Sequence, residues 1–306
     1  MNEKRPGFCH LCGEKLHGSY LVYSNGLVVC ERCNRSVPHC SQCNLPSRQL
    51  TTARGVQICP ACRQKAPICA CCREPILGRY FLVGDSPLRY CEVCMNTRPR
   101  CDICRAPLDD QGKIFQGRDG KAYRCSTCFS TVVNDPAEAM HLYNETYLLL
   151  SKALQLEIAV LPKLSLVERA RMIELHQQAG ILAGIASTNI PLGPEHQHLL
   201  GFFQSVGIDQ TIYIEQLLPQ TLFRAVAAHE LAHSWQSTHA PQGQAAKIVE
   251  GFAEWVAYRT LLLLGHQGAA ARLTRRNDLY GVGLQYFIAL ERQQGQQAVL
   301  QRASRM

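Results

Sequence analysis

The sequence predicts an α+β protein, in which a tandem array of small β-hairpin zinc-ribbon modules precedes a mainly α-helical domain with a small sheet. Two observations predict this architecture. All 17 cysteines lie between Cys9 and Cys128, and sixteen of them form Cys-x-x-Cys pairs. From residue 135 onward, cysteine is absent and the apolar residues recur mostly with a helical period. We therefore expect two domains, residues 1–130 and 131–306.

The cysteine pairs form a fourfold internal repeat. Two consecutive pairs make one module, with 17, 15, 18 and 20 residues between its pairs, and 6 residues separate each module from the next. A constant spacing of this kind indicates tandem copies of one structural unit. The four modules cover residues 9–33, 40–62, 69–94 and 101–128.

Short β-type runs lie between the cysteine pairs. Residues 20–23, 80–83 and 114–115 are rich in aromatic and β-branched residues, and turn residues such as Asn25-Gly26 follow them. Each module is therefore predicted to be a β-hairpin with a cysteine knuckle at each end.

Each module supplies four thiolates, which suits a tetrahedral Zn²⁺ site. So small a module cannot bury enough apolar surface to fold alone, so the metal would supply much of its folding free energy. We expect four structural zincs, with rubredoxin-type iron as the alternative, and a free thiol or alternative ligand at Cys71. The predicted ligands are Cys9, Cys12, Cys30, Cys33, Cys40, Cys43, Cys59, Cys62, Cys69, Cys72, Cys91, Cys94, Cys101, Cys104, Cys125 and Cys128.

The charge distribution bears on possible partners. Residues 1–130 hold 19 Lys and Arg against 10 Asp and Glu, a balance of +9 within a total of +8. Sixteen thiolates around four Zn²⁺ ions contribute −8, which nearly cancels this balance. The basic residues are thus expected to offset the thiolates, which makes nucleic acid an unlikely partner. The modules are expected to recognise proteins.

No segment of the sequence suggests a membrane or secreted protein. The longest apolar runs are much shorter than the roughly 18 residues that a membrane span needs. Residues 1–7 carry charges and no apolar stretch, unlike a secretory signal. A cytoplasmic location is therefore expected, in which paired cysteines bind metal more often than they form disulfides.

The second domain is predicted to have a helical lead-in (135–200) and a core (205–306). Residues 137–160 and 165–179 have the apolar period of helices, and turns are expected at Pro191 and Pro194 within a mixed stretch. Residues 210–215 alternate like an edge strand, which could bind an extended peptide by strand addition. Further helices are predicted over residues 221–237 and 244–264.

The third helix of this region carries the sequence His229-Glu230-Leu231-Ala232-His233. Residues four apart share a helix face, so both imidazoles can bind one metal ion. Glu230 lies beside them, where it can take a proton from an activated water. This pattern predicts a zinc metallopeptidase with one catalytic zinc in addition to the four structural ones.

Two residues are candidates for the third zinc ligand. His239 has the metzincin spacing, but Gln236 occupies the position of the metzincin glycine, and no methionine follows before Met306. Glu250 is favoured because it resembles the glutamate that gluzincins supply from a following helix. Glu254, one turn later, is predicted to orient His229 by a hydrogen bond.

The predicted mechanism is peptide-bond hydrolysis in protein substrates. Glu230 would act as the general base and then protonate the leaving amine. Tyr280, in the sequence Tyr280-Gly-Val-Gly283, is the first candidate for a donor to the oxyanion, and His266 is the second. The alternative function is a zinc-finger adaptor for other proteins, with a weakly active or inactive peptidase domain.

Residues 130–306 resemble the ubiquitin-activated LIM-domain zinc metallopeptidases that limit organ growth in plants, and a prokaryotic relative fits the resemblance. The matching segments are Leu164–Arg169, Leu217–Pro219, Ala228–Trp235, Val249–Gly251 and Tyr280–Gly283. The resemblance implies a gluzincin-type peptidase domain with a single catalytic zinc, which acts in the cytosol on regulatory proteins and is linked to ubiquitin or ubiquitinated proteins. It also makes the cysteine modules LIM-like, although the LIM module of that family uses a histidine ligand and a two-residue link between its zinc sites.

Overall fold

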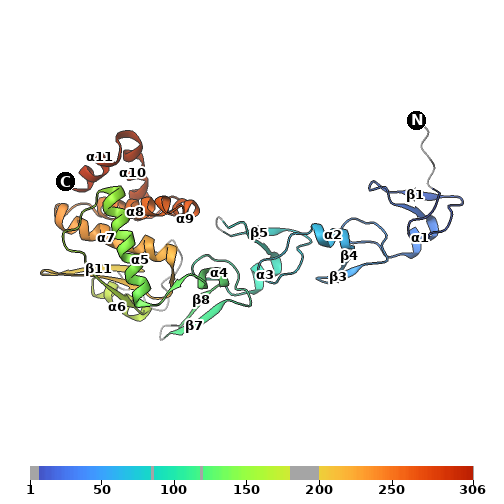
Figure 1. Ribbon diagram of the computed structural model, residues 1–306, viewed down its shortest axis with the longest axis horizontal. Coiled ribbons are helices and arrows are strands. Elements are labelled where there is room, and N and C mark those ends of the chain that lie inside the picture. Colours follow the sequence, from blue (N-terminus) through green and yellow to red (C-terminus); the bar gives the residue numbers. More distant parts are fainter. Residues whose placement is uncertain (1–6, 84–85, 118–119, 180–199, 306) are drawn as a thin grey trace. The chain divides into compact units, whose positions relative to one another are not determined.

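The computed structural model describes residues 7–83, 86–117, 120–179 and 200–305. It divides into two compact units, Met1–Leu82 with Pro87–Thr97, and Val83–Ser86 with Arg98–Met306. The first unit contains the first three cysteine modules, and the second contains the fourth module together with the helical region (Figure 1). The boundary expected at residues 130/131 therefore lies inside one packed unit.

Every module is a two-stranded antiparallel hairpin followed by a short helix, so the predicted hairpins are confirmed. The helices were not predicted, because each is a single short segment that begins at the second cysteine pair. The sulfur of Cys30, for example, accepts a hydrogen bond from the backbone N–H of Cys33 and so caps the first helix. The elements of the first unit are β1 (Tyr20–Val22), β2 (Val28–Cys30), α1 (Glu31–Ser36), β3 (Thr51–Ala53), β4 (Val56–Ile58), α2 (Pro60–Lys65), β5 (Tyr80–Leu82), β6 (Arg89–Cys91) and α3 (Glu92–Thr97).

The second unit begins with the fourth module and continues into helices around a small sheet. Its elements are β7 (Lys113–Gly117), β8 (Gly120–Arg124), α4 (Ser126–Phe129), β9 (Val132–Val133), α5 (Pro136–Leu149), the π-helix η1 (Leu150–Leu154), β10 (Lys163–Val167), α6 (Arg169–Gln178), β11 (Gly201–Val206), β12 (Asp209–Glu215), β13 (Leu218–Pro219), α7 (Gln220–His239), α8 (Ala246–Leu263), α9 (Gln267–Leu273), α10 (Leu279–Gln294) and α11 (Gln296–Ala303).

The three-stranded sheet corrects two predictions. Its order is β10–β12–β11, with β12 parallel to β10 and antiparallel to β11. The strand predicted at 210–215 is therefore central and hydrogen-bonded on both sides, so it cannot accept a peptide by strand addition; β11 is an edge strand of this sheet. The helix predicted over 165–179 is wrong in its first turn, because residues 163–167 alternate in polarity and form β10. The turns expected at Pro191 and Pro194 lie outside the described residues.

The core of the second unit is built around α8, which packs against both α7 and α10. Trp255, Phe252 and Phe287 are fully buried where these helices meet. Two glycines allow α8 and α10 to approach closely, since a Cβ atom on Gly251 would lie 2.6 Å from the Cα of Gly283. This contact places the second turn of α10 beside the second turn of α8.

The fourth module shares the core of the second unit. The guanidinium of Arg124, which is 1% exposed, donates to the backbone oxygen of Leu217 at 3.3 Å. Strand β9, just after the module, pairs with β13, just before α7. The module therefore supports the chain segment from which α7 begins.

Within the described residues, no helix combines the length and apolar character that crossing a membrane requires.

Candidate metal centre

The four cysteine quartets predicted from the sequence each come together in space. In every quartet the four sulfur atoms lie within 4.8 Å of one another. The Cys12–Cys30, Cys43–Cys59 and Cys104–Cys125 sulfur pairs are 4.0, 3.9 and 3.6 Å apart. A tetrahedral zinc with Zn–S bonds of about 2.3 Å separates its sulfurs by about 3.8 Å, so these quartets fit zinc.

Backbone N–H groups favour the thiolate form of one sulfur in each of the first three modules. The sulfur of Cys9 accepts from the backbone N–H of Leu11 and of Cys30, both at 3.4 Å. Burial raises the pKa of Cys9, but these donors and that of Cys12 outweigh it and lower the pKa to about 6. Cys40 and Cys69 have the same arrangement, and their pKa is also lowered to about 6.

Cys71 is a fifth thiol at the third module. Its side chain is buried, and the quartet that forms there contains its neighbour Cys72 instead. Cys71 hydrogen-bonds with the ligand Cys94, whose pKa is raised by burial and by its contacts with other thiols. It therefore lies next to the predicted zinc site without belonging to its four-sulfur set.

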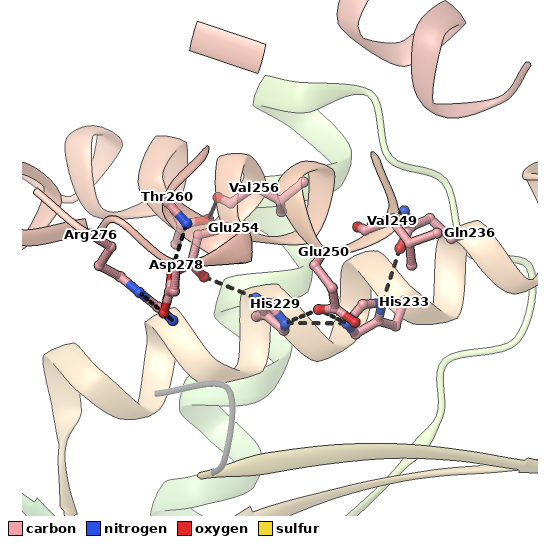
Figure 2. Close-up of polar contacts among 11 residues, drawn as sticks. His229, His233, Gln236, Val249, Glu250, Glu254, Val256, Thr260, Arg276 and Asp278 are labelled. Atoms are coloured by element: carbon pink, nitrogen blue, oxygen red, sulfur yellow. Dashed lines mark hydrogen bonds and ion pairs between the residues drawn. The ribbon is translucent and has the colours of Figure 1, made fainter. Parts of the chain in front are cut away.

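A different cluster forms where α7 meets α8. The Nε2 atoms of His229 and His233 are 3.1 Å apart, and Oε2 of Glu250 lies 3.5 and 3.4 Å from them (Figure 2). Ligands on a tetrahedral zinc with bonds of about 2.0–2.1 Å lie about 3.3 Å apart. The three atoms are therefore spaced as one metal ion requires.

Side chains around this cluster fix the orientation of both histidines. Nδ1 of His229 lies 3.1 Å from Oε2 of Glu254, and Nδ1 of His233 lies 3.0 Å from Oε1 of Gln236. Gln236 in turn donates to the backbone oxygen of Val249 at 3.0 Å (Figure 2). Hydrogen bonds to Nδ1 leave Nε2 of each ring for a metal. Gln236, which displaces the metzincin glycine, thus has a role that the sequence did not suggest.

The electrostatics of the cluster favour a cation. Burial lowers the pKa of His229, but hydrogen bonds to Glu250 and Glu254 outweigh it and raise the pKa to about 10. Burial raises the pKa of Glu250, whereas its hydrogen bonds to both histidines lower it well below the ordinary value. A divalent metal ion would satisfy the same demand for positive charge by displacing the histidine proton.

Glu230 lies on the wall of a cavity of about 500 Å³ that also contains the His229–His233–Glu250 cluster. It is 3% exposed, and burial raises its pKa, which brings it closer to the range useful to a general base at neutral pH. Gly201 of the edge strand β11 lies against it, since a Cβ atom there would be 2.5 Å from Oε1 of Glu230. Any side chain at 201 would therefore displace Glu230 or Val226 from its present position.

Tyr280 lines the same cavity from the first turn of α10. Its ring centroid is 6.2 Å from that of His229. Burial raises the pKa of its hydroxyl, so the group stays protonated at neutral pH and can donate a hydrogen bond. This position is compatible with the oxyanion donor that the sequence suggested.

The two other candidate histidines lie elsewhere. His239 stacks on Trp235, with ring centroids 4.6 Å apart, and its Nδ1 lies 2.9 Å from the backbone oxygen of Trp235. His266 directly precedes α9 and lines a second cavity of about 440 Å³ beside the fourth module. His266 was the second candidate for the oxyanion donor, but it does not line the cavity that contains the cluster, so this prediction is wrong.

Sequence reasoning also missed His176, Gln236, Gly201 and Arg276, the last of which donates a hydrogen bond to Oε1 of Glu254 at 2.6 Å. His176 is buried on α6, and its ring meets that of Phe202 edge-on at 5.3 Å on the cavity wall. None of these residues has a motif of its own. A signal existed only at Gly201, as a glycine just before a β-type run.

The chain was compared with known protein families, curated proteins and solved structures, and no match was found in any of the three comparisons.

Proposed function

We propose that the chain is a zinc-dependent endopeptidase in which His229, His233 and Glu250 hold the catalytic metal. The observation that carries the proposal is the convergence of these three ligand atoms beside the buried carboxylate of Glu230, in a cavity edged by a β-strand. Three protein ligands leave one position for water or substrate, as catalytic zinc sites do. Bound there, Zn²⁺ would polarise a peptide carbonyl and lower the pKa of a coordinated water.

The protein side chains carry out the proton transfer, the stabilisation of charge and the orientation of the ligands. Glu230 accepts the proton of the attacking water and passes it to the leaving amine. The hydroxyl of Tyr280 donates to the negative charge that develops on the carbonyl oxygen. Glu254 and Gln236 hold the two imidazoles in the tautomer that leaves Nε2 to the metal.

Protein substrates are part of this proposal. Strand β11 is an edge of its sheet, and Gly201, Phe202 and Phe203 line the cavity next to Glu230. An extended peptide can add to such an edge through main-chain hydrogen bonds. The resemblance to the LIM-domain peptidases adds a link to ubiquitin, which a binding titration of the full chain with ubiquitin tests.

A second function, as a protein-binding adaptor, is favoured by one observation. The β1 and β5 strands expose all three of their residues, including Val22 and Leu82, which are 61% and 57% exposed. Exposed apolar side chains of this kind suit contact with another protein. The adaptor would need the cysteine modules but not Glu230.

One substitution separates the two functions. Glu230→Gln keeps the size of the side chain but removes the base, so we expect five bound zincs per chain and cleavage of a peptide library reduced by at least about a hundredfold. Glu174→Gln, on the exposed face of α6, is the matched control and should cleave normally. Equal cleavage by Glu230→Gln and the parent would refute the mechanism, and no cleavage by the parent would favour the adaptor.

A further inference from the structure

Arg276 is a buried cation between α8 and α10. Its side chain is 4% exposed, and it donates through Nη1 to Oε1 of Glu254 at 2.6 Å. Through Nη2 and Nε it donates to Oδ2 of Asp278 at 2.6 and 3.2 Å (Figure 2). A buried guanidinium is stable only when paired and hydrogen-bonded in this way.

The first of these contacts leads to the metal cluster. Glu254 is completely buried, and its two oxygens have different partners: Oε1 accepts from Arg276, and Oε2 lies 3.1 Å from Nδ1 of His229. Since both oxygens are engaged, the carboxylate cannot rotate without breaking one contact. The position of Arg276 therefore determines the orientation of the Glu254 carboxylate relative to the imidazole of His229.

The second contact leads to the first turn of α10. Asp278 caps this helix by accepting from the backbone N–H of Gly281 at 3.0 Å through its other oxygen. The guanidinium carbon of Arg276 lies 4.9 Å from the ring centroid of Tyr280, a cation–π distance. A Cβ atom on Gly281 would lie 2.2 Å from the backbone oxygen of Arg276, so the two segments are in direct contact.

We propose that Arg276 is a positioning residue. Through Glu254 it fixes the orientation of the metal ligand His229 relative to Tyr280. This inference rests on the proposed peptidase function. A single rigid fork of donors joins the two sides of the cavity: the carboxylate behind the metal ligand and the turn that carries the hydroxyl donor. A lysine ammonium is a point charge and lacks the planar fork that serves both carboxylates and the ring.

The test compares Arg276→Gln, Arg276→Lys and the exposed neighbour Arg275→Gln in the full chain. The affinity of the most readily chelated metal is measured by competition with a chromophoric chelator, and Co²⁺ placed in that site reports ligand geometry through its visible spectrum. kcat, KM and the melting temperature complete the set. We expect Arg276→Gln to weaken metal binding and to lower kcat, each about 10- to 100-fold, with KM nearly unchanged.

Arg276→Lys should recover most of the metal affinity, because it keeps a cation on Glu254, but not kcat, because Tyr280 loses its support. The Co²⁺ spectrum should change in Arg276→Gln and not in Arg275→Gln. Unchanged affinity, spectrum and kcat in a folded Arg276→Gln would overturn the proposal, as would complete recovery of kcat by lysine. Where the glutamine variant does not fold, the lysine variant decides.

The measurements also separate the two proposals. A parent protein that binds the fifth metal but cleaves no peptide would refute the peptidase function. The metal affinity and the Co²⁺ spectrum of the Arg276 variants would still decide whether this residue orders His229.

Discussion

The four cysteine quartets and the His229–His233–Glu250 cluster hold their ligands in two different ways. Each quartet is built from one module, and backbone N–H groups of the same module stabilise its sulfurs, as at Cys9. The cluster draws ligands from α7 and α8, and its histidines are oriented by side chains that depend on α8 and α10. Each quartet offers four ligand atoms, whereas the cluster offers three and opens onto a cavity.

The difference separates sites that stabilise a fold from a site suited to chemistry. A quartet offers four sulfur ligands from a single module, enough to complete the coordination of a zinc ion without water or substrate. The cluster leaves a coordination position available and depends on how three helices pack. The two kinds of site should therefore respond to different substitutions.

The largest loss of stability is expected when a cysteine of the fourth quartet is replaced, because this quartet belongs to the core of the second unit. Cys104→Ser should destabilise the helical region, because the fourth module packs into the same apolar core, whereas Cys12→Ser should disturb only the first unit. A structural zinc contributes about 10–16 kcal/mol of binding free energy in small zinc domains, so loss of the fourth should unfold its module. Calorimetry and limited proteolysis measure the stability of the helical region in both variants. Equal destabilisation of that region by the two substitutions would contradict the expected difference.

Removal of the third ligand comes next. Glu250→Ala should reduce the metal content from five to four and weaken binding at the cluster by more than about a hundredfold, which exceeds the loss typical of an outer partner. His239→Ala should keep five, because its ring stacks on Trp235 instead of facing the cluster. Metal analysis after gel filtration checks both variants, and the opposite result would assign the ligand to His239.

A substitution at the contact between α8 and α10 should have a smaller effect on stability and on metal binding. In Gly283→Ala the new methyl group would lie 2.5 Å from the Cα of Gly251 and 2.6 Å from the backbone oxygen of Lys247, so α10 must move away from α8. We expect a loss of about 1–3 kcal/mol in the free energy of unfolding of the second unit. Metal binding at the cluster should also weaken, because Glu250 adjoins this contact.

The control is Val282→Ala, at an exposed position of the same helix. It should leave cluster affinity unchanged, and the cysteine quartets should be unaffected in both variants. Urea unfolding and chelator competition provide the two measurements. Wild-type stability in Gly283→Ala would show that the cluster does not depend on this packing.

The smallest effect, taken per pH unit, is the dependence of metal binding on pH. His229 has a pKa raised to about 10, so the metal-free cluster carries a proton there at neutral pH, and a metal ion must displace it. Below that pKa the apparent affinity should therefore rise about tenfold for each pH unit and level off above it. Titrations between about pH 6 and pH 8 test this, and a flat profile in that window would contradict it.

The pH dependence of metal affinity should differ between the cysteine quartets and the cluster. Cys33 and Cys62 have pKa values raised to about 12, mainly by burial and by contacts with other thiols. Metal binding must remove several thiol protons there, so affinity should rise with pH more steeply than at the cluster.

The spacing of residues along the chain was sufficient to predict the cysteine quartets and the His229–His233 pair, whereas Glu250 was selected by its likeness to the gluzincin glutamate. Cysteines three residues apart in a knuckle, and histidines four apart on a helix, are brought together by local geometry alone. Glu254 was also predictable, since it follows Glu250 by one helical turn. The hairpins of the modules followed from short β-type runs bounded by turn residues.

The supporting residues were not predictable in this way. Gln236, Arg276 and Gly201 act across contacts between elements that are distant in sequence, and no local pattern marks them. The central position of β12 and the cavity faced by His266 depend likewise on which elements pack together.

Local spacing thus predicted the cysteine pairs and the histidine pair, because a helix turn or a hairpin knuckle fixes those distances by itself. Tertiary packing decided the rest. It joined the fourth module to the helical core, left β11 as an edge strand over Glu230, and placed Arg276 between Glu254 and Tyr280. These arrangements arise from burying apolar helix faces and pairing buried charges, which only the folded chain brings into contact.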